Sequence, residues 1–287
     1  FMDRYNYTIL TSAATDKLNG APVVNAKGQV IGLFSISGTS QSATDANYPK
    51  DFVLKGLSQN DASLRQSGLR IGLPHTLEEA VVALMLSSEK PENVHEAVIK
   101  DFIEKFPQAN DGYFALANMQ IAKGEISDAD KTLQTAIGKA KAKDEAHYNY
   151  ARLVYQNVLI PSLEEKVKAV GWSLDKALGE IQQAQSIQQV DAYRHLQAQI
   201  IFAKGDYEKA YTEFDALTKT KFNNPELYLE MAQGRQHLGA TDKEILDLLN
   251  KSIELCDTPY VSTSAPYFYT RGQQLEKMGE YRKAIQD

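Results

Sequence analysis

The chain has 287 residues, 43% of them hydrophobic and 24% charged, and its formal net charge at pH 7 is −6. This composition is typical of a folded protein with one elongated domain or two compact ones, and the acidic balance argues against nucleic acid as a partner. Cys256 is the only cysteine, and no apolar run approaches the roughly 18 residues of a membrane span, so the sequence predicts neither an internal disulfide nor a membrane-spanning helix.

Residues 1–73 are predicted to form β-structure and turns. The runs YNYTILTS and QVIGLFSIS are rich in β-branched and aromatic residues, which favour strands. Two β-type runs, Pro22–Asn25 and Gln29–Ser37, flank the turn Asn25-Ala26-Lys27-Gly28 and indicate a hairpin. The polar stretch SGTSQSATDANYPKD that follows predicts a long loop.

The hairpin segment, LNGAPVVNAKGQVIGLFSIS, resembles the end of a trypsin-like, chymotrypsin-fold serine protease, including the bacterial HtrA-type members. Gly20-Ala21-Pro22 aligns with the Gly-Gly-Pro that follows the nucleophile in that family, and Gly32-Leu33-Phe34-Ser35 aligns with a later Gly-x-x-Ser. The resemblance implies that residues 1–73 are the β-rich C-terminal part of a trypsin-like barrel. It also implies a bacterial protein that is periplasmic or secreted.

On this alignment the requirements of catalysis are not met. Asn19 stands at the nucleophile position, Leu18 replaces the preceding acidic residue, and Lys17 replaces a glycine that helps to form the oxyanion hole. A histidine cannot activate an asparagine amide as it activates a serine hydroxyl, and the nearest histidine is His75. We therefore predict a protease-like module without its nucleophile and no catalytic residue in this chain. The alternatives are an unrelated β segment and part of an active protease whose histidine and aspartate lie upstream of Phe1.

In the trypsin-like family the strand after Gly-x-x-Ser pairs with an extended substrate. Ser35-Ile36-Ser37 takes that place here, so the resemblance makes it a candidate edge for strand addition. Such an edge would bind a peptide without any catalysis.

From residue 74 onward helical periodicity dominates. Thr76 with Glu79 three residues later fits a capping box that begins the first helix. The apolar residues Ile71 and Leu73 are expected to dock on the following run AVVALML. We assign residues 74–287 to a helical repeat domain. Because the chain ends within a helical pattern, we expect it to be a fragment of a longer protein.

The helical part repeats. The segments IAKGEISDADKTL (121–133), FAKGDYEKAYTEF (202–214) and LEKMGEYRKAIQD (275–287) match one another, each with a glycine turn between an apolar helix end and a second helix. A period of about 34 residues is typical of a solenoid of helix–turn–helix units. The predicted units lie near 76–109, 110–143, 144–190, 191–224, 225–264 and 265–287.

This pattern resembles the tetratricopeptide repeat (TPR) family. The matching positions are small residues in the first helices (Ala117, Ala151, Ala198, Ala232, Gly272), turn glycines (Gly124, Gly205, Gly239, Gly279) and alanines in the second helices (Ala97, Ala129, Ala177, Ala210, Ala284). In the unit near 225–264, Glu244 replaces the expected small residue and Leu248 takes the next apolar position. The stretch NVLIPSLEEKVKAV is an insertion. The expected fold is therefore mainly α, a TPR-type superhelix preceded by a small β segment.

The TPR resemblance implies a non-enzymatic scaffold whose concave groove, lined by the first helices, binds a protein or peptide. Transfer of the family's register gives the candidate peptide-binding residues Asn118, Tyr148, Arg152, Tyr155, His195 and Gln199. Arg152 beside Asn118 is expected to hold one carboxylate. In that family, a clamp of several basic groove residues binds two carboxylates, and most of those basic residues are absent from this sequence.

Neither a metal nor a cofactor is predicted. The histidines lie far apart without a His-x-x-x-His spacing, and the run GLRIGLP has two glycines but no phosphate-binding pattern. The rival to the scaffold is an enzyme: a fragment of an active trypsin-like serine protease whose repeats recruit substrate.

Overall fold

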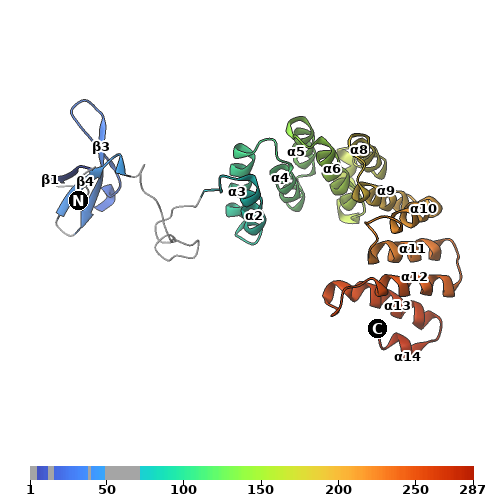
Figure 1. The fold of residues 1–287 in the computed structure, drawn as a ribbon. Coiled ribbons are helices and arrows are strands. Elements are labelled where there is room, and N and C mark those ends of the chain that lie inside the picture. Colours follow the sequence, from blue (N-terminus) through green and yellow to red (C-terminus); the bar gives the residue numbers. More distant parts are fainter. Residues whose placement is uncertain (1–4, 12–15, 38–39, 49–71) are drawn as a thin grey trace. The chain divides into compact units, whose positions relative to one another are not determined.

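A computed structural model of the protein describes residues 5–11, 16–37, 40–48 and 72–287. The chain divides into two compact units, Phe1–Gly72 and Leu73–Asp287. The first unit contains strands and the second contains helices (Figure 1).

The first unit is built on one antiparallel sheet. Its strands are β1 (Tyr7–Leu10), β2 (Pro22–Val24), β3 (Val30–Ser37) and β4 (Ser40–Asp45), in the order β1-β4-β3-β2. The predicted hairpin is confirmed as β2 and β3. Its turn is closed by the Asn25 side chain, whose Oδ1 accepts from the backbone N–H groups of Lys27 at 2.9 Å and Gln29 at 3.0 Å. Gly28 has φ +75°, a conformation that glycine adopts without strain.

Strand β4 lies inside the stretch that was predicted as a long loop, so that prediction is wrong. The residues SQSATD are small and polar, but β4 pairs with β3 on one side and with β1 on the other. Ser42 and Ala43 are 6% and 2% exposed. Propensity is a weak guide here because a central strand is stabilised by its two neighbours rather than by its own side chains.

The described residues of the first unit do not show a trypsin-like barrel. Strands β1 and β2 are the two edges of a single four-stranded sheet. Phe34 and Ala43 are the only buried hydrophobic side chains among the residues described in this unit, and a closed barrel needs a filled interior. The barrel expected from the protease resemblance is therefore not supported.

The second unit consists of helices that pack as successive pairs. The pairs are α2 (Leu77–Ser87) with α3 (Glu92–Lys105), α4 (Asn110–Ala122) with α5 (Ile126–Lys139), α6 (Lys143–Val158) with α8 (Leu174–Ile187), α9 (Asp191–Ala203) with α10 (Tyr207–Thr218), α11 (Pro225–His237) with α12 (Asp242–Glu254), and α13 (Ala265–Lys277) with α14 (Tyr281–Ala284). The short helix α7 (Glu164–Ala169) lies in the predicted insertion. Within this unit the helices follow an arc, with α2, α4, α6 and α9 on its inner side (Figure 1).

The first helix begins where the sequence predicted. The Thr76 hydroxyl accepts from the backbone N–H of Glu79 at 3.4 Å and donates to the Glu79 carboxylate at 3.0 Å. Leu73 packs on the cluster that contains Ala80 and Leu84, as expected. Its predicted companion Ile71 lies outside the described residues.

The turn glycines end the first helices of four pairs. Gly124, Gly205, Gly239 and Gly279 have φ between +74° and +88°. In the turn at Gly124, the glycine N–H donates to Ile121 and the next N–H, of Glu125, donates to Gln120, both at 2.8 Å. This is the Schellman pattern, which needs a left-handed residue and therefore favours glycine.

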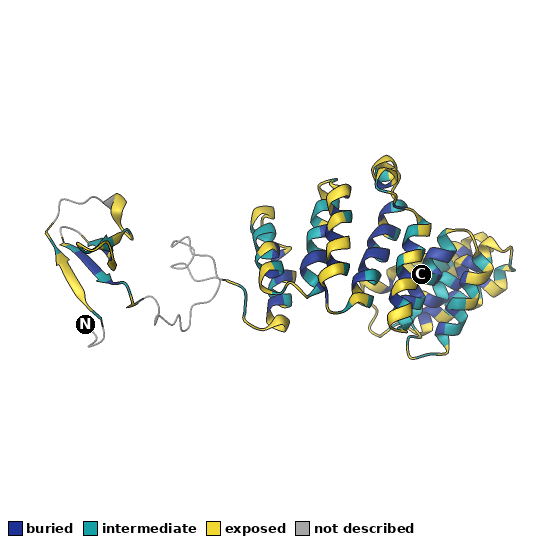
Figure 2. Ribbon diagram, turned by 90° about the horizontal axis from the view of Figure 1, so that it is seen from above, coloured by how far each residue is buried: buried dark blue, intermediate teal, exposed yellow. Residues whose placement is uncertain are grey.

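Small residues lie where neighbouring helices cross. Ala117, Ala151 and Ala198 of the first helices are 0% exposed, and so are Ala129 and Ala177 of the second helices. The larger side chains one turn further along, Leu133, Ile181 and Phe214, are at most 1% exposed. Buried residues run along the facing sides of successive helices in Figure 2, which gives the continuous core of a solenoid.

The predicted register is wrong by one residue in α12. Glu244, placed at the small-residue position, is exposed and instead completes a capping box with Thr241. Thr241 begins the helix two residues after Gly239, whereas Asp206 begins α10 directly after Gly205. The longer turn shifts every later position, so Ile245 and Leu249 are buried at 3% and 1% exposed. Leu248 is only half-buried.

The segment that follows the insertion is fastened to α5 and α6, and α6 carries three of the six predicted groove residues. Trp172, 2% exposed, donates from Nε1 to the Asp130 carboxylate at 2.7 Å, and the Tyr150 hydroxyl donates to the same oxygen. Burial raises the pKa of Tyr150, and the hydrogen bond to Asp130 raises it further. The network links α5, α6 and the segment before α8, so it holds α6 in place.

The register in α12 can be tested with two neighbouring leucines. Leu249→Ala should lower the free energy of unfolding by about 2–5 kcal/mol because it leaves a cavity in the core. Leu248→Ala is the matched control and should cost clearly less, since part of that side chain already contacts water. Urea denaturation followed by circular dichroism measures both. An equal or larger loss for Leu248→Ala would refute the register described here.

Candidate functional site

Five of the six predicted groove residues line one cavity between α6 and α9. The cavity has a volume of about 130 Å³. Tyr148, Arg152 and Tyr155 reach it from α6, and His195 and Gln199 reach it from α9. Positions four and three apart lie on one face of a helix, so α6 presents its three side chains together. Ala151, on the same helix, is 0% exposed and belongs to the core.

The sixth residue, Asn118, lies elsewhere. It is exposed on α4 and lines a second cavity of about 790 Å³ between α2 and α4. Its Nδ2 donates to the backbone carbonyl of Phe114 at 2.8 Å. Asn118 and Arg152 therefore line different cavities, and their joint binding of one carboxylate stays a prediction. The side chain that lies against Arg152 is the Phe114 ring.

Arg152 lies over aromatic rings. Its Cζ atom is 4.5 Å from the centroid of the Phe114 ring and 5.5 Å from that of Tyr148. Tyr148 in turn stacks on Tyr193 with a centroid distance of 4.9 Å. Such cation–π contacts hold a guanidinium in place and leave its N–H groups available.

No carboxylate partners Arg152 within the part of the chain that the structure describes. The arginine ion pairs found there are those of Arg194, Arg235 and Arg271. Arg152 is therefore a fixed cation whose hydrogen-bond donors suit a carboxylate from another molecule.

The other side of the cavity is a hydrogen-bonded network. His195, 8% exposed, lies with Nε2 2.6 Å from one oxygen of Glu230, and the Gln199 amide donates to the other oxygen at 2.7 Å. The His195 ring also packs against Phe214 and Phe222, with centroid distances of 5.9 and 5.3 Å. The polar side-chain atoms of His195 and Gln199 are thus already bound to Glu230 on α11.

Sequence reasoning missed Glu230 and its neighbour Glu226. Both carboxylates lie on α11, one turn apart, in the unit that follows His195. The preceding unit also pairs a histidine with a glutamate, His147 with Glu180 at 2.6 Å, but that contact joins α6 to its own partner helix α8 and so gave no signal for Glu230. The residues of each pair are separated by about one repeat period.

These carboxylates make the α11 side of the groove negative. Partial desolvation raises the pKa of Glu226, and the Glu230 carboxylate raises it further, while His195 opposes the shift. Burial raises the pKa of the Tyr155 phenol, and the negative charges of Glu230 and Glu226 raise it further. The groove therefore runs from a cation on α6 to two carboxylates on α11.

Asn19, at the expected nucleophile position, has a structural role. It is exposed, and its Oδ1 accepts from the backbone N–H of Ile36 at 3.4 Å. No histidine precedes His75 in the sequence, so the described residues of the first unit contain no nucleophile–base pair. The edge expected at Ser35–Ser37 pairs with β4 on one side, and Asn19 covers the Ile36 amide on the other.

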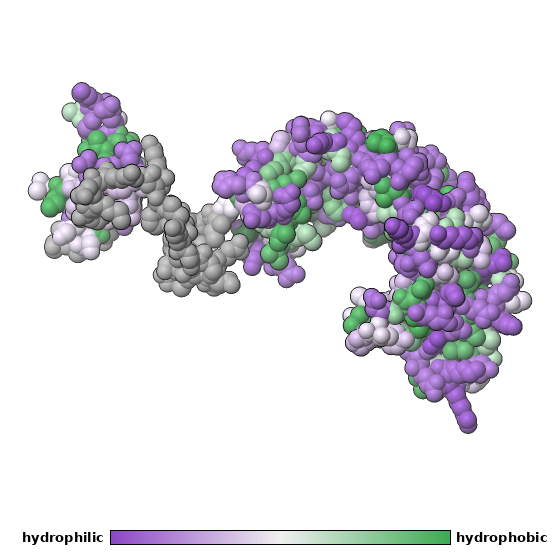
Figure 3. Space-filling view, viewed as in Figure 1, coloured by the Kyte–Doolittle hydropathy of each residue, from purple (hydrophilic) through white to green (hydrophobic). Residues whose placement is uncertain are grey.

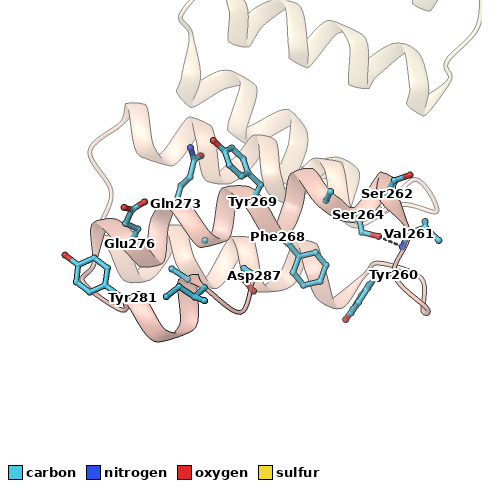
Figure 4. A pocket seen from close by; sticks show the side chains of 14 residues that line it. Tyr260, Val261, Ser262, Ser264, Phe268, Tyr269, Gln273, Glu276, Tyr281 and Asp287 are labelled. Atoms are coloured by element: carbon cyan, nitrogen blue, oxygen red, sulfur yellow. Dashed lines mark hydrogen bonds between the residues drawn. The ribbon is translucent and has the colours of Figure 1, made fainter.

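A third cavity, of about 750 Å³, lies beside α13 and α14 (Figure 4). Tyr260 and Phe268 form an edge-to-face pair in its wall, with ring centroids 4.8 Å apart. Asp287, which also lines it, is held by Arg271. None of the predicted groove residues lines this cavity.

The described ranges contain no cluster of three or more histidine, cysteine, aspartate or glutamate side chains that would hold a metal ion. The helices described are also all too short or too polar to cross a membrane.

No family model and no curated protein matches the chain. Among solved structures it is similar to PilF of Pseudomonas aeruginosa, with 15% identity over 73% of this chain and 89% of that chain and a TM-score of 0.50. It is also similar to the Cut9–Hcn1 hetero-tetramer of APC/C, with 14% identity over 74% and 39% of the two chains and a TM-score of 0.53. For TTC0263, a TPR protein of Thermus thermophilus, the identity is 13% over 73% of this chain and 99% of that chain, and the TM-score is 0.49.

These likenesses support a mainly helical fold of the TPR type. At 14–15% identity these likenesses concern the fold alone. The protease resemblance of residues 1–73 gains no support from them.

The network around Glu230 can be tested by substitution. Glu230→Ala should lower the free energy of unfolding by about 1–3 kcal/mol, because it leaves the buried His195 and the half-buried Gln199 without their partner. Glu230→Gln keeps an acceptor oxygen and should cost less. Both are measured by urea denaturation at pH 7. Equal losses below about 0.5 kcal/mol, the range of ordinary surface changes, would show that the network contributes nothing to stability.

Proposed function

We propose that this protein is a non-enzymatic scaffold that binds a protein segment or peptide over the cavity between α6 and α9. The observation that carries the proposal is Arg152, a guanidinium fixed over two aromatic rings without a carboxylate partner among the described residues. Tyr148 and Tyr155 add aromatic surface beside it. Aromatic residues and arginine are the side chains that most often dominate the energy of protein interfaces.

The size of the cavity favours a peptide over a small molecule. Pockets for cofactors and drug-sized ligands measure about 300–1,000 Å³. At about 130 Å³ this cavity admits one small side chain, while the rest of the ligand lies along the surface of the first helices. Solenoids offer extended concave surfaces of this kind.

The charges in the groove favour a peptide that carries an acidic group at one end. An acidic group of the ligand pairs with Arg152 on α6, and its other end faces Glu226 and Glu230 on α11. A polyanion would meet those two carboxylates and a net charge of −6, so a peptide is a better ligand than nucleic acid.

Of the predicted residues, we assign direct contact to Tyr148, Arg152 and Tyr155. His195 and Gln199 are assigned to the floor of the cavity, since their polar atoms are bound to Glu230. Asn118 is assigned to the neighbouring cavity on α4.

The proposal is tested with peptides of about twelve residues selected from a random displayed library against the full chain. Arg152→Gln should weaken the selected peptides by roughly 1–4 kcal/mol, the range of interface hot spots. This substitution leaves Tyr148 unchanged. Because Tyr148 stacks on Tyr193, the packing of α6 on α9 stays intact. Fluorescence anisotropy measures the dissociation constants.

Arg235→Gln is the matched control. Arg235 lies over the Tyr211 ring at 4.7 Å, in the same manner as Arg152, but it does not line the cavity between α6 and α9. It should leave peptide affinity unchanged. If the two variants weaken binding equally, or if neither does, the ligand does not bind at Arg152 and the proposal is wrong.

A further inference from the structure

The cavity between α2 and α4 is mainly apolar and has a volume of about 790 Å³. Its walls include Val81, Leu84 and Met85 of α2 and Phe114 and Met119 of α4. Figure 3 shows hydrophobic surface gathered where α2 and α4 lie in Figure 1. Exposed apolar surface of this kind marks an interaction site, and methionine adapts its shape to different partners.

Helix α2 leaves large apolar side chains in water. Met85 is 68% exposed and faces the cavity, and Leu86, beside it, is 63% exposed but does not line it. A helix that is apolar on several faces is normally covered.

The polar rim of this cavity is mostly paired within the protein. Lys123 lies 2.8 Å from a carboxylate oxygen of Glu92 and 3.2 Å from one of Glu96. Lys90 and Asp111, of opposite charge, complete the charged part of the rim. The rim therefore gives a ligand little net charge to recognise, and apolar contact decides what enters.

The two cavities of the groove meet at one contact. Phe114 lines the apolar cavity, and the guanidinium of Arg152, which lines the smaller cavity, lies 4.5 Å from the centre of its ring. A single ligand that crosses Phe114 therefore meets an apolar cavity on one side and, on the other, a cation that has no carboxylate partner among the described residues. The charge of Arg152 selects a carboxylate at that point.

We propose that the cavity between α2 and α4 is an apolar anchor subsite for the same peptide. It takes a bulky apolar side chain, such as leucine, isoleucine, phenylalanine or methionine, and the adjoining residues of the peptide present a carboxylate to Arg152. This inference rests on the proposed function and names the chemistry of its ligand: an apolar residue next to an acidic one. The small cavity beyond Arg152 accepts only a small side chain of the same peptide.

The test uses the peptides selected against the full chain. The enriched sequences should carry a large apolar residue within a few positions of an aspartate, a glutamate or the terminal carboxylate. Met85→Lys should weaken their binding about tenfold or more. Leu86→Lys is the matched control and should change affinity less than about twofold, since the side chain is equally exposed on the same helix but outside the cavity. Circular dichroism checks that both variants are folded.

The possible outcomes separate this inference from the proposed function. If Arg152→Gln weakens the peptides but Met85→Lys does not, the anchor subsite is refuted and the groove proposal stands. If neither weakens them, or if no peptide is enriched over the Met85→Lys/Arg152→Gln double variant, both are refuted. If the wild-type chain self-associates in light scattering and Met85→Lys abolishes this without affecting peptides, a second copy covers the cavity and the inference is wrong.

Discussion

The close approach of neighbouring helices at alanine is the constraint on which the helical unit depends. A pair of helices of this length cannot bury its apolar faces alone, so each pair must pack on the next. Ala117, Ala151 and Ala198 are fully buried at these crossings, and a larger side chain there would push the helices apart. Because Ala151 turns inward, Arg152, the next residue along α6, reaches the cavity. The packing of the core thus decides which side chains the groove presents.

The same stacking produces contacts between side chains about one repeat apart. His195 meets Glu230 because stacking brings α11 of the next unit to α9, whereas His147 meets Glu180 across the pair formed by α6 and α8. These contacts fix the groove before a ligand arrives. A fixed surface loses less conformational entropy on binding, which favours affinity. Arg152 fits this picture, since the Phe114 and Tyr148 rings hold its guanidinium in position.

The type of the helical fold could be predicted from the sequence because glycine turns and buried alanines recur at a regular period. The register failed in α12 because one extra residue in the turn before Thr241 shifted every later position, and a repeat pattern read by spacing alone does not detect this. For the groove, the sequence correctly predicted that Tyr148, Arg152 and Tyr155 share one face of α6, because spacings of four and three residues determine this. The partner of His195 was missed because Glu230 is distant in sequence and reaches the site only when the units stack.

In the N-terminal part, the sequence predicted a local hairpin correctly but not the larger fold around it. Local similarity to a protease segment predicted a hairpin, and a hairpin is present, but the surrounding barrel is not supported. A turn with Asn25 and Gly28 specifies its own hairpin whatever the larger fold is. Asn19 illustrates the same point, since its amide serves the strand next to it rather than any chemistry.

The central claim is that a peptide lies over the cavity between α6 and α9, and photocrosslinking tests it most directly. Benzoylphenylalanine replaces Tyr155, which lines the cavity, or Tyr211, which does not. The account predicts that a selected peptide crosslinks to the chain substituted at Tyr155 and that unlabelled peptide competes for this product. Crosslinking at Tyr211 that equals or exceeds that at Tyr155 would contradict it.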